Sequence, residues 1–250
     1  MRQLPEKVVL MKEGGRILTT IMSHVLSNIS VGTTGFDLEK IFAHQISQAK
    51  VHSAFQGYEG YPYHLCIGVN DMVVHGFPSD KKYQNGDIVS VDMGIIYKGY
   101  YVDMARTVVV GEDIHQYQPF IEAVKKAHFA SVAQAAVGAK VGDMAAASQQ
   151  IVEGEHPYGV VREMVGHGVG ERLHMLPDVP GYGKAHSGPV LKEFQTLAVE
   201  IIAIRHKNPA IKTLSDGWQT KSVTGEVCAI YENTIFVGKS GGELLTGSRE

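Results

Sequence analysis

The chain has 250 residues, of which 44% are hydrophobic, and a formal net charge of -3 at pH 7. This length allows one large domain with a substantial core, and the absence of a long Lys/Arg block argues against a specific nucleic-acid partner bound through its phosphates. The two cysteines, Cys66 and Cys228, are too few for a disulfide framework or a thiolate zinc cluster.

The amino terminus, MRQLPEKVVLMKEGG, mixes both charge signs and lacks the apolar core of a signal peptide. No run of about 18 apolar residues, the length that spans a bilayer, occurs in the sequence. These features predict a cytoplasmic globular protein that has no membrane partner and keeps both cysteines as reduced, buried thiols.

Two amphipathic helices are predicted near the amino terminus. Between Glu6 and Ser30 the apolar residues recur three and four positions apart, although Gly14 and Gly15 weaken the first half of this stretch. A second helix follows the turn VGTTG, where Leu38 and Phe42 begin a similar pattern.

A related pattern recurs in the second half of the chain. After another helical run, PFIEAVKKAHFASVAQAAV, a constant offset of 106 positions relates Gly138, Asp143 and Met144 to Gly32, Asp37 and Leu38. One such match arises easily by chance, but the shared preceding helix favours a duplication. We therefore predict a single domain over residues 1–250 with two similar halves, about 1–110 and 111–250.

Strand-like segments follow each pair of helices. The first half contains CIGVNDMVVHG, DIVSVDMGIIY and GYYVDMARTVVVG, and the second contains TLAVEIIAI, GWQTKSVTG and VCAIYENTIFVG. No linker rich in Pro, Ser or charge separates the halves. This order predicts an α+β fold in which helices cover a largely antiparallel sheet.

The segment VSVDMGIIYKGYYVDMART is unusual because each arm of a predicted hairpin carries a carboxylate. A turn centred between Tyr97 and Lys98 would place Asp92 directly opposite Asp103, with Cβ atoms roughly 5 Å apart. Like charges in that position destabilise a sheet unless something positive lies between them. The hairpin is therefore predicted to hold a proton or a metal ion.

Two more acids, Glu200 in TLAVEIIAI and Glu232 in VCAIYENTIFV, also interrupt apolar strands. A single such acid is most often paired with Lys or Arg, but four of them in four apolar strands favour a metal site. Several carboxylates suit divalent ions such as Mn, Fe or Co, and two ions can share bridging carboxylates. The loop VGHGVGERLH adds His167 and His174 as candidate imidazole groups.

Motifs for other kinds of catalysis are missing. The sequence contains no HExxH zinc motif, no GxSxG nucleophile elbow and no P-loop, and GHGVG lacks the full GxGxxG spacing. Covalent catalysis therefore has no candidate nucleophile.

The segments that flank these acids and His167 are QGYEGYP, VVHGFP, GHGVGERLH and DGWQTKSVTG. In these segments, and in the order and spacing of the acids and of His167, the chain resembles type I methionine aminopeptidases over nearly its whole length. The resemblance implies the pita-bread fold, an α+β fold with an antiparallel sheet, two helix pairs and internal pseudo-twofold symmetry. It also implies two divalent metal ions (Mn, Fe, Co or Zn). Asp92 would hold one ion, Asp103 and Glu232 would bridge both, and His167 and Glu200 would complete the other.

The resemblance also implies catalytic roles. A hydroxide bridging the ions would attack the scissile carbonyl, while His174 would hydrogen-bond the carbonyl oxygen, His75 would contact the amide nitrogen and Glu200 would shuttle the proton. The implied substrate is the amino terminus of a nascent polypeptide that carries methionine followed by a small residue. We expect a monomer, and a transient contact with the ribosome is compatible with this activity.

By the same resemblance, an apolar, aromatic pocket suited to a thioether is lined by Phe55, Tyr58, Tyr61, Cys66, His75, Leu173 and Trp218. The chain departs from the common bacterial pattern at Phe55, where a small residue such as cysteine is frequent. It also departs at Leu173, where phenylalanine is frequent, and at Ile201, where proline is usual. These departures affect the expected substrate preference and remove no ligand.

Two alternative functions stay open at this point. X-Pro dipeptidases and aminopeptidase P resemble this family in fold and ligands, but they usually carry an additional amino-terminal domain, which we expect to be absent here. A non-catalytic binding module of the same fold would commonly have lost metal ligands, whereas this chain keeps all five.

Overall fold

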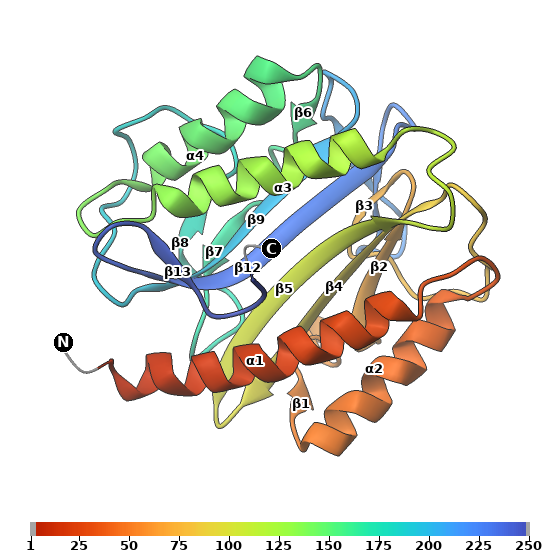
Figure 1. Cartoon of the computed structure of the whole chain (residues 1–250), viewed down its shortest axis with the longest axis horizontal. Helices are drawn as coiled ribbons and strands as arrows, with labels where there is room; N and C mark the ends of the chain where they lie inside the picture. Colours follow the sequence, from red (N-terminus) through yellow and green to blue (C-terminus); the bar gives the residue numbers. More distant parts are fainter. Residues whose placement is uncertain (1–3, 249–250) are drawn as a thin grey trace.

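The computed structural model describes residues 4–248, which form two pairs of α-helices and three antiparallel sheets. The first pair, α1 (Glu6–Ser27) and α2 (Gly35–Ala49), lies along one side of the molecule, and the second pair, α3 (Gln118–Ala133) and α4 (Val141–Gln149), lies along the other (Figure 1). A π-helical turn (Gln150–Glu155) extends α4. The four helices expected from the apolar spacing are confirmed.

Each half of the chain contributes one large sheet. In the first sheet the strand order is β1–β4–β2 with β5 also paired to β4, and in the second it is β13–β12–β9–β7–β8 with β6 paired to β9. The first sheet contains β1 (His52–Ser53), β2 (Leu65–Val69), β4 (Ile88–Tyr97) and β5 (Tyr100–Val109). The second contains β6 (Gly159–Val160), β7 (Gly166–Gly168), β8 (Met175–Val179), β9 (Thr196–Ile204), β12 (Cys228–Val237) and β13 (Gly242–Leu244). A small third sheet has the order β10 (Ile211–Thr213), β11 (Thr220–Ser222), β3 (Met72–Val74).

The starts of α2 and α4 show why the two helix pairs resemble each other. The Asp37 carboxylate accepts a hydrogen bond from the Thr34 N–H (3.1 Å), and the Asp143 carboxylate accepts one from the Lys140 N–H (2.8 Å). Such bonds satisfy N–H groups that a helix start leaves unpaired. These two contacts lie 106 residues apart, and so do the last residues of α1 and α3.

Along the central strands, hydrophobic side chains point toward the helices, and the acidic side chains point to the opposite face of the sheet. In β5, Val102 and Met104 are fully buried in one core with Leu18 of α1. Because successive strand residues point to opposite faces, Asp103 points away from that helix. The same alternation in β12 turns Glu232 away from α3.

The β4–β5 hairpin closes with a two-residue loop. Tyr97 pairs with Tyr100, and both loop residues, Lys98 (φ 47°) and Gly99 (φ 85°), have a left-handed backbone. This conformation matches the twist of the flanking strands and favours glycine. The turn is therefore centred one residue later in the chain than the sequence analysis predicted.

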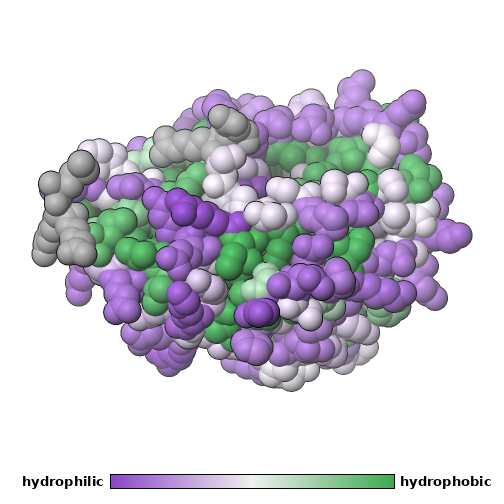
Figure 2. All heavy atoms as spheres, turned by 60° about the horizontal axis from the view of Figure 1, so that its bottom comes forward, coloured by the Kyte–Doolittle hydropathy of each residue, from purple (hydrophilic) through white to green (hydrophobic). Residues whose placement is uncertain are grey.

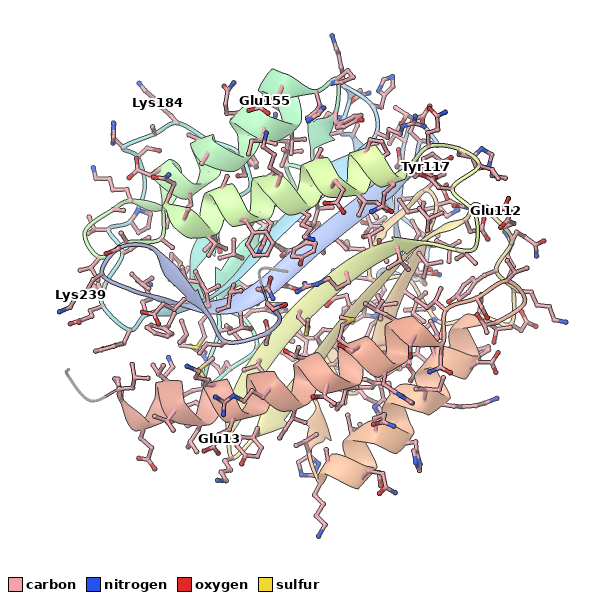
Figure 3. The ribbon with its side chains drawn as sticks, in the orientation of Figure 1. Glu13, Glu112, Tyr117, Glu155, Lys184 and Lys239 are labelled. Carbon is pink, nitrogen blue, oxygen red and sulfur yellow. The ribbon has the colours of Figure 1, made fainter. Side chains whose placement is uncertain are left out.

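Charged groups lie mainly at the periphery. Glu112, Glu155, Lys184 and Lys239 lie around the rim of the molecule in Figure 3, away from the central strands. On the face shown in Figure 2, hydrophilic residues cover much of the surface, and hydrophobic residues appear mostly in recesses between them. Among residues 4–248, no helix is both long enough and apolar enough to span a bilayer.

Candidate metal centre and active site

The hairpin register changes the predicted relation between its two acids. Asp92 pairs with Ala105, and Asp103 pairs with Gly94. The prediction that Asp92 and Asp103 lie directly opposite each other is therefore wrong, because the loop contains both Lys98 and Gly99. The two acids are instead diagonal neighbours on one face of the hairpin, a position from which side chains can still meet.

A direct opposition of acids does occur, in the second sheet. Glu200 of β9 pairs with Glu232 of β12 in the antiparallel ladder. Two like charges in that relation destabilise the sheet unless a proton or a cation lies between them. This pair therefore needs the positive charge between its carboxyl groups that was predicted for the hairpin.

Side chains from three segments distant in sequence converge at one point. Asp103, His167 and Glu232 are buried, and each offers a ligand atom within 4.8 Å of those of the other two. Asp92 and Glu200 are half-buried and line the same cavity. All five predicted ligands therefore border one space, although they come from β4, β5, β7, β9 and β12.

The electrostatics of the carboxylates show that this space needs positive charge. Burial, followed by the charge of Asp103, holds the pKa of both Asp92 and Glu232 well above the usual range. Burial and the Glu200 charge raise the pKa of Asp103 to about 8, and burial raises that of Glu200 to about 7. Among the described residues, one oxygen each of Asp92 and Asp103 is buried without a hydrogen-bond partner. Carboxylates with free oxygens, joined by an imidazole, fit divalent metal ions.

His167 is prepared to act as a ligand through one ring nitrogen. Burial, followed by the influence of His174, lowers its pKa to about 4, so the ring is neutral at pH 7. Its Nδ1 lies 3.0 Å from the Gly168 carbonyl oxygen, which can only accept, so Nδ1 carries the proton. The Nε2 lone pair is then free, as a metal-binding histidine requires.

His75 and His174, the two other histidines predicted to act in catalysis, border the same site. The His174 ring lies edge-on to the His167 ring at 4.4 Å, and the hydroxyl of Tyr58 is 2.8 Å from His174 Nδ1. His75 follows β3 with a left-handed backbone (φ 54°) and packs edge-on against Trp218 at 5.9 Å. Such a backbone is uncommon outside glycine and tends to occur at functional sites.

The predicted pocket residues form a continuous apolar wall beside the acids. Phe55, Tyr61, Cys66 and Leu173 are buried in one cluster, against which Trp218 packs edge-on to Tyr61 at 5.1 Å. The cavity between this wall and the acids measures about 360 Å³. Every residue predicted as ligand, catalytic group or pocket wall borders it.

Several residues at the same cavity were not predicted from the sequence. Glu59, Glu163, Met164 and Asp178 also line it. Glu59 lies inside the QGYEGYP segment with a left-handed backbone (φ 48°), and the succession of Gly and Tyr there was the available signal. No spacing rule marks Glu163, Met164 or Asp178, because the packing of the sheets brings them to the cavity.

Comparison with known proteins identifies the family of the chain. Residues 9–239 match the model of metallopeptidase family M24. The methionine aminopeptidase of Clostridium perfringens is 34% identical over 240 residues, 96% of each chain, and methionine aminopeptidase 1 of Bacillus subtilis is 34% identical over 242 residues, 97% of each chain. The crystal structure of methionine aminopeptidase from Thermotoga maritima superposes with a TM-score of 0.94 at 34% identity, covering 98% of both chains.

A more distant likeness extends to prolidases. The prolidase of Pyrococcus horikoshii gives a TM-score of 0.75 at 21% identity over 98% of this chain and 63% of that chain. This likeness concerns the fold alone. The predicted pita-bread fold and the predicted family resemblance are both confirmed, and the chain belongs to metallopeptidase family M24.

Proposed function

We propose that this protein is a metal-dependent aminopeptidase that removes the initiator methionine from nascent polypeptides. The observation that carries the proposal is the meeting of four carboxylates and His167 at the edge of a 360 Å³ aromatic pocket. Relatives that cover almost the whole chain at 34% identity are methionine aminopeptidases.

Asp92, Asp103, His167, Glu200 and Glu232 would hold two divalent ions, with Mn, Fe, Co and Zn as candidates. When bound, such ions lower the pKa of a coordinated water and polarise a carbonyl group. Four carboxylates would neutralise the charge of two divalent cations, which accounts for their accumulation at one point.

The other site residues would orient the substrate. The apolar pocket would bind the methionine side chain, since a flexible thioether packs well on aromatic rings. Its wall consists of Phe55, Tyr58, Tyr61, Cys66, Leu173 and Trp218. His174 would donate a hydrogen bond to the carbonyl oxygen as charge develops there, and His75 would contact the amide nitrogen. Glu200 would carry the proton from the attacking water to the leaving amine.

The residue after methionine would have to be small, because a tight site beyond the scissile bond rejects bulky side chains. The natural substrate would then be a nascent chain in the cytoplasm, processed by a monomer with only transient contact to the ribosome. X-Pro cleavage is not favoured, because the prolidase likeness concerns the fold alone.

Peptide cleavage after removal and readdition of metal tests this proposal. The protein is treated with a chelator, supplied with Mn²⁺, Fe²⁺ or Co²⁺, and assayed on Met-Ala-Ser and Ala-Pro-Ala. We expect metal-restored release of methionine and no cleavage of Ala-Pro-Ala. Preferential cleavage before proline would support a prolidase-like activity instead, and the absence of cleavage by folded, metal-loaded protein would support a binding module.

A further inference from the structure

The two central strands meet without a backbone ladder. Strands β5 and β12 run side by side in the middle of the molecule (Figure 1) and contact each other along their length. Within the part of the chain that the structure describes, β5 pairs only with β4, and β12 only with β9 and β13. The boundary between β5 and β12, called the seam below, therefore joins the two half-sheets, and Asp103 and Glu232 lie on either side of it.

Side-chain hydroxyls replace the missing ladder at both ends of the seam. The Asp103 N–H donates to Thr234 Oγ1 (2.8 Å), and the same hydroxyl donates back to the Asp103 carbonyl (2.9 Å). At the other end, the Ile230 N–H donates to Thr107 Oγ1 (2.9 Å), and this hydroxyl donates to the Ile230 carbonyl (2.9 Å). Each threonine thus occupies the place where an antiparallel partner would exchange its N–H and C=O bonds.

An arginine fills the seam between the two threonines. Arg106 Nη1 donates to the Ala105 carbonyl (2.8 Å) and to the Glu232 carbonyl (2.6 Å). Its guanidinium lies 3.9 Å from the centre of the Tyr231 ring. Three side chains in succession therefore hold the two backbones together.

This arrangement controls the distance between two candidate ligands. Paired strands lie about 4.8 Å apart, and a hydroxyl between two backbones holds them farther apart than a direct bond does. Asp103 is bonded to Thr234 at one threonine contact, and Glu232 lies between Ile230 and Thr234, one in each threonine contact. The carboxylates of both acids meet His167. A change in the spacing of the seam would change the spacing of these two carboxylates.

The Thr107 hydroxyl and the Thr234 backbone are each held by a further hydroxyl. Thr107 uses its only proton on Ile230, so Ser90, whose hydroxyl lies 2.8 Å away, donates to it. Thr246 Oγ1 accepts from the Thr234 N–H at 2.9 Å. All four side chains are buried, so water does not compete for these bonds.

We propose that Thr107 and Thr234 are positioning residues whose hydroxyls set the spacing between Asp103 and Glu232 and thereby the geometry in which metal ions are held. This inference rests on the proposed function. The threonines themselves bind neither metal nor substrate and act through the two acids.

The test compares loss of the hydroxyl with its retention. Thr107→Val and Thr234→Val keep the shape and remove the hydroxyl, while Thr107→Ser and Thr234→Ser keep the hydroxyl. Mn²⁺ affinity and stoichiometry are measured by calorimetry, and the visible absorption spectrum of the Co²⁺-loaded protein reports ligand geometry. The matched control is Ser148→Ala in α4, which removes a buried hydroxyl that donates a hydrogen bond to the Gly181 carbonyl.

We expect each valine variant to bind Mn²⁺ about 10- to 100-fold more weakly, the usual effect of losing an outer partner of a metal ligand, and to have an altered Co²⁺ spectrum. The serine variants and Ser148→Ala should resemble the unmodified protein. If a valine variant does not fold, Ser90→Ala removes only the bond that orients Thr107 and should weaken binding roughly two- to tenfold.

If the valine variants keep the Mn²⁺ affinity and the Co²⁺ spectrum of the unmodified protein, this inference is wrong and the metal site is intact. The same conclusion follows from unchanged values in Ser90→Ala where a valine variant does not fold. If the unmodified protein binds no divalent ion, the proposed function fails first and this inference fails with it.

Discussion

Glu200 and Glu232 stand directly opposite each other across the β9–β12 ladder, with no backbone offset between them. In the metal-free protein, burial raises the pKa values of both, and the charges of neighbouring carboxylates raise that of Glu232 further. A pair of this kind stabilises the fold only when a proton or a cation lies between the two carboxyl groups.

The metal-free protein should therefore lose stability as the pH rises from 6.5 to 8. In the unfolded chain these carboxyls are ionised near pH 4, whereas in the fold Glu200 and Asp103 keep protons up to about 7 and about 8. Because the folded state binds more protons than the unfolded state in this window, its stability falls with rising pH. Thermal melting in a chelator should show a falling Tm, and saturating Mn²⁺ should abolish the fall. A Tm that stays constant or rises with pH in the chelator would contradict this prediction.

Asp103→Asn should abolish turnover. The substitution removes a charge from the group in which the ligand atoms of Asp103, His167 and Glu232 lie within 4.8 Å of one another. We expect kcat/KM to fall by more than about 100-fold, since even outer partners of a metal ligand contribute 10- to 100-fold. Glu155→Gln, at the rim of the molecule (Figure 3), is the control and should be unaffected. Normal turnover by Asp103→Asn with metal bound would refute the ligand role.

Tyr58→Phe should lower kcat more than it raises KM. The ring that lines the pocket is kept, and only the hydroxyl 2.8 Å from His174 Nδ1 is lost. A hydrogen bond of about 1 kcal/mol corresponds to a loss of about fivefold in kcat. The control is Tyr158→Phe, because Tyr158 packs against Phe120 of α3. A change in KM alone would mean that Tyr58 serves only as pocket wall.

His128→Leu should gain stability relative to the unmodified protein as the pH falls. His128 is fully buried, and burial followed by the charge of Arg106 lowers its pKa to about 3. The unfolded chain takes up a proton near pH 6.5 that the fold cannot accept, so stability due to this residue is lost below that pH. Urea unfolding should show a relative gain of about 2 kcal/mol for the variant between pH 7.5 and 5.

The exposed His44 provides the matched substitution, and His44→Leu should show no such pH-dependent gain. If His128→Leu and the unmodified protein keep a constant difference in unfolding free energy over this range, the ring of His128 is protonated in the folded state and the prediction is wrong.

The helices, the central strands and the acids that interrupt them could be predicted from the amino-acid sequence. These features depend on local periodicity, in which apolar residues recur every three to four positions in α1 and every second position in β5. The order of the acids and of His167 in their flanking segments was enough to indicate the family. None of these features depends on which strands become neighbours.

The pairing of the acids across the strands and the contacts that join the two half-sheets depend on the three-dimensional packing of the chain. The loop of Lys98 and Gly99 set the hairpin register and moved Asp92 away from Asp103. A one-residue difference in a turn leaves the alternation pattern of each strand unchanged, so the sequence pattern could not detect it. The seam bond from Thr107 to Ile230 joins residues 123 positions apart, and contacts of that range arise only when complete sheets pack against each other.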